Sequence, residues 1–135
     1  MLYNSLFIHS YILALRSKSN QDMPLFIPVM LIGLCLALNL MSILFFVEGV
    51  TTQRLEIFNN KNEYVVGVLI YCSVFLYYLH KKRYKRIFET YKAKHSEPPA
   101  IWWSIMVVAL YYLVSVFIVF LSGFYRNKDW IFSGL

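Results

Sequence analysis

The residues of this chain that could do chemistry by their type and spacing lie mostly inside long apolar stretches. Cys35, Asn39 and Ser42 follow one another at i, i+4 and i+7, so a helix would place them on one face. Asn39 is the most polar of the three. Its amide must be hydrogen-bonded, because an unpaired polar group in hydrocarbon costs several kcal/mol. The spacing predicts a hydrogen bond from Asn39 to a neighbouring helix, with contact to a ligand or substrate as the alternative.

A second polar stripe lies near the C-terminus and consists of serine and tyrosine hydroxyls. Its members are spaced at i, i+7, i+11 and i+18, which is one helical face: Ser104, Tyr111, Ser115 and Ser122. Tyr71, in another apolar stretch, could reach this face. We interpret these groups as partners of one another and of Asn39 inside a helical bundle. The alternative is a polar seam that another protein or a small solute recognises.

Small residues mark a third pattern, because Gly33 and Ala37 are separated by four positions. Such spacing lets two helix backbones approach closely, either within the chain or with a partner. The three patterns together predict one seam for helix packing or partner contact. Its residues are Gly33, Ala37, Asn39, Tyr71, Tyr111 and Ser115.

Catalytic and metal-binding patterns are not evident in the sequence. The histidines are far apart, at His9, His80 and His95, and the acids of the first inter-span loop are Glu48, Glu56 and Glu63. Neither set has the spacing of a metal site or an acid–base pair. We therefore expect no catalytic residue, metal or cofactor, and a protein that is not an enzyme. Transporters usually carry charged groups within their spans, and the long apolar stretches contain no Asp, Glu, Lys or Arg. An oligomeric channel remains an alternative.

Three long apolar runs must position these residues, at about 23–47, 64–80 and 101–125. The chain is 59% hydrophobic with a mean hydropathy of +0.56. A helix needs about 20 apolar residues to cross a bilayer core about 30 Å thick. The fold class is therefore an all-α membrane protein with three transmembrane helices and one domain over residues 1–135. A soluble bundle with buried central helices is the alternative.

Two flanking segments complete the predicted architecture. Residues 1–15 are apolar but short, which favours a helix lying in the membrane interface over a fourth span. After the second span, residues 81–95 contain no glycine or proline and carry an apolar stripe at helical spacing. We therefore expect one continuous helix over residues 64–94, about 45 Å long, whose basic end projects into the cytoplasm.

The net charge of +6 is concentrated, since seven of the thirteen basic residues fall between Lys81 and Lys94. The positive-inside rule then places the connection 81–98 in the cytoplasm and the C-terminus outside. We expect membrane lipid as a partner and no nucleic acid. The residues expected to contact anionic lipid or a protein are Lys81, Lys82, Arg83, Lys85 and Arg86. The expected interface anchors are Trp102, Trp103 and Trp130.

The pattern P-x-F-x-P-V-x-L-I from Pro24, with K-R-Y-K-R-I from Lys82, resembles small membrane proteins of Bacteroidota-like bacteria without an assigned function. In architecture the chain also resembles the immunity proteins that protect against membrane-targeted bacterial toxins. This resemblance implies a bacterial inner-membrane protein that binds another membrane protein or a toxin. The alternative function is an accessory subunit of a larger membrane complex, and a homo-oligomer is a further possibility.

Overall fold

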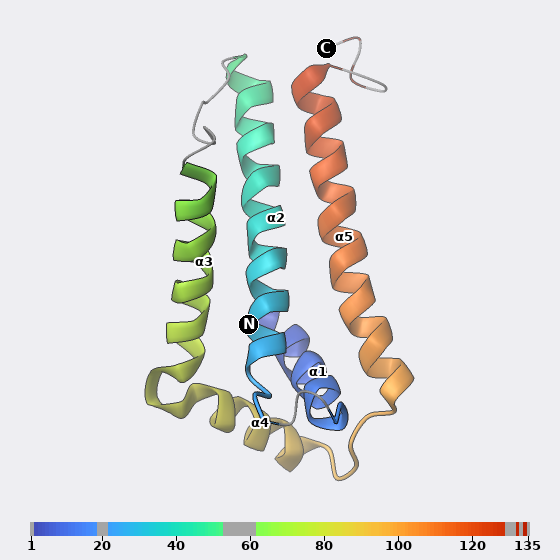
Figure 1. Ribbon diagram of the computed structural model, residues 1–135. Helices are drawn as coiled ribbons and strands as arrows, with labels where there is room; N and C mark the ends of the chain where they lie inside the picture. Colours follow the sequence, from blue (N-terminus) through green and yellow to red (C-terminus); the bar gives the residue numbers. More distant parts are fainter. Residues whose placement is uncertain (1, 19–21, 53–61, 129–131, 133, 135) are drawn as a thin grey trace.

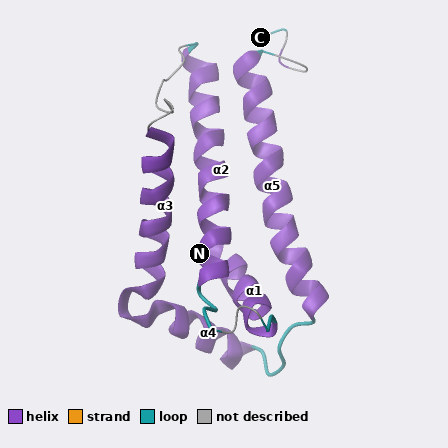
Figure 2. Cartoon of the chain, viewed as in Figure 1, coloured by secondary structure: helices purple, strands orange, loops and turns teal. Residues whose placement is uncertain are grey.

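The computed structural model describes residues 2–18, 22–52, 62–128, 132 and 134, and these residues form helices without strands. Figures 1 and 2 show the helices in chain order. Their bounds are α1 Leu2–Arg16, α2 Phe26–Thr51, α3 Asn62–Leu79, a 3₁₀ turn His80–Lys82, α4 Arg83–Lys94 and α5 Ile101–Asn127.

Three of these helices are long and apolar enough to cross a membrane, as the sequence predicted. They stand in a row, with α2 between α3 and α5 (Figure 1). α2 packs most extensively against α5 and less against α3, while α3 and α5 make no close backbone approach to each other. The three spans therefore form an open layer in the described part of the chain, and each outer helix leans on α2.

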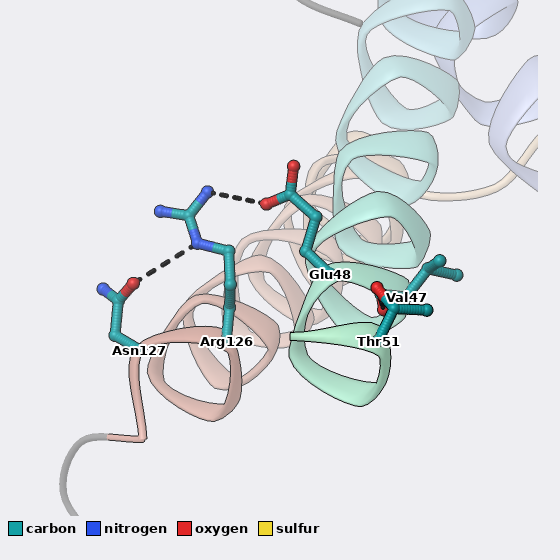
Figure 3. Close-up of polar contacts among 5 residues, drawn as sticks. All are labelled: Val47, Glu48, Thr51, Arg126 and Asn127. Carbon is teal, nitrogen blue, oxygen red and sulfur yellow. Dashed lines mark hydrogen bonds and ion pairs between the residues drawn. The ribbon is translucent and has the colours of Figure 1, made fainter. Parts of the chain in front are cut away.

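The bounds of α2 differ from the predicted 23–47 at both ends. The helix begins at Phe26, which puts Pro28 in the first turn, where its missing N–H removes no helical hydrogen bond. At the other end the helix continues to Thr51. Glu48 there forms an ion pair with Arg126 of α5 at 3.3 Å, which Figure 3 shows. Gly49 packs against the ring of Tyr125, so this glycine serves helix packing rather than ending the span.

The prediction of one continuous helix over residues 64–94 is wrong. Lys81 and Lys82 both have φ 51°, a left-handed conformation, and the chain turns there so that α4 runs across the end of the spans (Figure 1). The physical reason is tertiary packing. The turn brings the apolar stripe of α4 onto α1, where Phe88 meets the ring of Tyr11 with centroids 5.0 Å apart. A straight helix would have left that stripe in water.

The N-terminal segment is helical, and α1 packs against α2, α4 and α5. Leu6 and Phe7 are fully buried, and Phe7 stacks on Tyr78 of α3 with ring centroids 4.4 Å apart. The hydrophobic core therefore lies near the ends of the spans where α1 packs against them. Its residues are Leu6, Phe7, Val29, Ile32, Cys35, Val74 and Tyr78. The position of α1 relative to a bilayer stays a prediction.

Candidate functional site

The close helix approach predicted at Gly33 occurs within the chain. A Cβ atom on Gly33 would overlap the ring carbons of Tyr71, so the absent side chain is what lets α3 lie against α2. Gly33 is buried, Tyr71 is half-buried, and Ala37 one turn further along α2 is also half-buried. Part of the predicted seam is therefore used for packing within the chain, between α2 and α3.

The amide of Asn39 finds its partner on α1 rather than on another span. Its Nδ2 donates a hydrogen bond to the hydroxyl of Tyr3 at 2.7 Å. Tyr3 was not among the predicted site residues, because it belongs to no helical stripe of polar residues that the sequence shows. The hydrogen bond fastens the start of α1 to the middle of α2.

The serine and tyrosine stripe of α5 is divided among separate partners. Ser104 is fully buried, and its Oγ lies 3.1 Å from Nδ1 of His9. Ser115 is buried and in hydrogen-bonding contact with the thiol of Cys35 on α2. Ser122 donates to the carbonyl of Ile118 within its own helix. We expected this stripe to pair with Asn39 and Tyr71, but two of its serines contact α1 and α2 instead, and the third bonds within α5.

Tyr111 of the stripe and its neighbour Tyr112 also make contacts inside the bundle. Tyr112 donates a hydrogen bond to the backbone carbonyl of Leu31 at 2.9 Å, and it was not among the predicted residues. Tyr111 is half-buried and packs against the core cluster. Because Tyr112 reaches across to a backbone group, no side-chain pattern in the sequence could have identified its partner.

His9 occupies a buried position among aromatic and polar groups. Its ring lies edge-on to Tyr91, with centroids 6.3 Å apart, and Tyr91 stacks on His95. Burial lowers the pKa of His9 below its ordinary value of 6.5, and the nearby His95 lowers this pKa further. The neutral imidazole is therefore the favoured form at neutral pH, and it forms a hydrogen bond with the hydroxyl of Ser104.

On the side of α3 that meets α2, side-chain burial decreases from the core toward the start of α3. On α3 the residues Tyr78, Val74, Tyr71, Gly67 and Tyr64 fall on one helical stripe. Tyr78 is 3% exposed at the core end, whereas Tyr64 is 78% exposed at the other. Among the described residues, no heavy atom lies within 4 Å of the position that a Cβ on Gly67 would take, one turn before Tyr71. Space is therefore open beside Gly67.

On α2, side-chain exposure also increases with distance from the core. Ile32 is 2% exposed at the core end, while Leu40 and Val47 are 39% and 37% exposed further along the helix. We name the space bordered by Leu40, Val47, Gly67 and Tyr64 the α2–α3 opening.

Nearer the core, α1, α2 and α3 border a pocket of about 350 Å³. Leu36, Val74 and Tyr77 line this pocket, together with Tyr3 of α1. Its walls are mainly apolar. The pocket could accept a bulky apolar side chain from a helix lying in the opening.

The predicted basic contact residues separate into two groups. Lys81, Arg83 and Arg86 line a groove between α4 and α1, whereas Lys82 and Lys85 are not among the residues that line it. Of the predicted interface anchors, Trp102 and Trp103 project from the start of α5 and are exposed. The third, Trp130, lies outside the described residues.

Among the described residues, no group of three or more histidine, cysteine or acidic side chains is placed to hold a metal ion. No family model, curated protein or solved structure matches the chain. Its classification therefore rests on its own architecture. The three long apolar helices make it a multi-pass helical membrane protein.

Proposed function

We propose that this protein acts by binding a protein partner within the bilayer, with a helix of that partner lying in the α2–α3 opening. The observation that carries the proposal is the open space beside Gly67, on the stripe of α3 that faces α2 at Tyr71. Small residues at such a position favour close packing of a further helix. Asn39 of the predicted seam is hydrogen-bonded to Tyr3, and Ser115 contacts the thiol of Cys35, so the partner would be recognised mainly by shape.

The specific function we propose is that of an immunity protein in a bacterial inner membrane, with the basic 81–98 connection in the cytoplasm. Such a protein would bind the helices of a membrane-targeted toxin, and this function requires no catalysis. An accessory subunit of a larger complex would use the same opening, and is the alternative proposal.

Site-specific cross-linking tests the position of the partner. A photoreactive amino acid replaces Leu40, which borders the opening, and in a matched variant it replaces Leu113 on an exposed surface of α5. We expect a cross-linked product of defined mass from position 40 and none from position 113. Equal products from both positions, or products with lipid alone, would contradict the proposal.

Steric substitution gives a second test on the same partner. Gly67→Leu fills space that no described residue occupies, so the protein should fold while its partner is excluded. Val68→Leu, one position along and already exposed, is the control. We expect the position-40 cross-link to fall at least tenfold in Gly67→Leu and to persist in Val68→Leu.

The identity of the cross-linked protein then separates the two functions. An immunity protein should restore the survival of cells that express the cross-linked toxin, and Gly67→Leu should abolish that protection. An accessory subunit should instead be needed for assembly or activity of the complex to which it cross-links. Survival unaffected by the protein would exclude the immunity role.

A further inference from the structure

The turn at Lys81 and Lys82 gives the protein a groove that a straight helix would not have. It lays α4 across the end of the spans and beside α1 (Figure 1). The two helices enclose a groove of about 630 Å³. The polar and charged residues that line it are Asn4, His80, Lys81, Arg83, Arg86, Thr90, Tyr91 and Lys94.

The charge of this groove has a single sign. Arg83, Arg86 and Lys94 recur at i, i+3 and i+11, so they share one face of α4, and Lys81 joins them from the turn. Its described lining contains no carboxylate. Four cationic groups that face one space repel one another, and a bound anion would relieve that repulsion.

The donors in the groove suit phosphate oxygens. A guanidinium presents two parallel N–H groups that match a phosphate, and an ammonium binds the same group as a point charge. The amide of Asn4 can add two donors from the opposite wall. Arg83 is already held in place, since its guanidinium carbon lies 4.3 Å from the ring centroid of Tyr77.

The position of the groove identifies the source of the phosphate. α3 runs from an apolar span directly into the turn, so the groove lies at the end of the spans, where lipid headgroups gather. Ile8 and Ile87 also line it and provide apolar contact beside the charges. We propose that this groove binds the phosphodiester headgroup of an anionic phospholipid.

Charge removal at matched positions tests the proposal. Arg86→Gln with Lys94→Gln removes two charges from the groove, while Lys82→Gln with Lys85→Gln removes two charges from residues that do not line it. Native mass spectrometry of the full chain in mild detergent measures retained phosphatidylglycerol, with phosphatidylcholine as the reference. At about 1 kcal/mol per basic residue, we expect binding to weaken about 30-fold in the groove pair.

We expect little change in the control pair, and retained affinity in Arg86→Lys with Lys94→Arg. Thr90→Trp should also block binding, because it fills the groove without changing the charge. Equal losses in both glutamine pairs would overturn the proposal in favour of diffuse attraction. Equal retention of phosphatidylglycerol and phosphatidylcholine would also overturn it. If millimolar inorganic phosphate displaced the lipid completely, the groove would be a site for free phosphate instead.

Discussion

At the scale of single residues, the buried pair of His9 and Ser104 links the packing of α1 to pH. The pKa of His9 is lowered in the folded protein, so between that value and 6.5 the unfolded chain binds more protons. The contribution of His9 to the free energy of unfolding is therefore fully present above about pH 6.5 and is lost as the pH falls toward the folded pKa.

We expect the wild-type protein to unfold at a lower temperature at pH 5 than at pH 8, measured by circular dichroism in detergent. His9→Gln should reduce this difference, whereas His95→Gln, at an exposed position, should largely preserve it. An unchanged pH dependence in His9→Gln would show that other groups control the response.

Two glycines on facing helices provide a residue-scale test of the packing of α2 and α3. Gly33→Ala should destabilise the protein by about 1–3 kcal/mol, because the added methyl meets the ring of Tyr71. Gly67→Ala should cost nothing and raise helix stability slightly, because its surroundings are open. Thermal unfolding of both variants in one detergent measures the contrast. Equal destabilisation would contradict the open surroundings of Gly67.

At the scale of elements, the turn between α3 and α4 sets a measurable distance. Spin labels on cysteines at Val68 and Ala93, in a Cys35→Ala and Cys72→Ser background, should be clearly closer than about 37 Å, the separation along a straight helix. Double electron–electron resonance in detergent or nanodiscs gives this distance. A distribution centred near the straight-helix value would support an uninterrupted helix and would contradict the existence of the basic groove.

At the scale of the whole molecule, the basic connection between α3 and α5 predicts the topology across the membrane. Reporters fused after Ala93 and after Lys128 should lie on opposite sides, because α5 separates the two positions. The positive-inside rule predicts the cytoplasm for Ala93. An alkaline phosphatase fusion should therefore be active after Lys128 and inactive after Ala93. The reverse result would show that charge does not orient this chain.

Local chemistry in the sequence was sufficient to predict the spans and the presence of a basic helix. Apolar runs of sufficient length have one stable solution in a bilayer, because helices satisfy their own backbone hydrogen bonds. Gly33, which lacks a Cβ, likewise predicted a close approach of two helices, but the sequence could not identify Tyr71 as the neighbour. Such properties depend on composition and on spacing along one element, which a sequence shows directly.

Only the tertiary structure decided how the elements meet. Propensity favoured an unbroken helix through Lys81 and Lys82, but packing of its apolar stripe on α1 overrode that preference. The pairing of Asn39 with Tyr3 and the space beside Gly67 also depend on where helices distant in sequence come to lie. Contacts between distant segments depend on the packing of the whole chain, so the two proposed binding surfaces became visible only once the helices were placed.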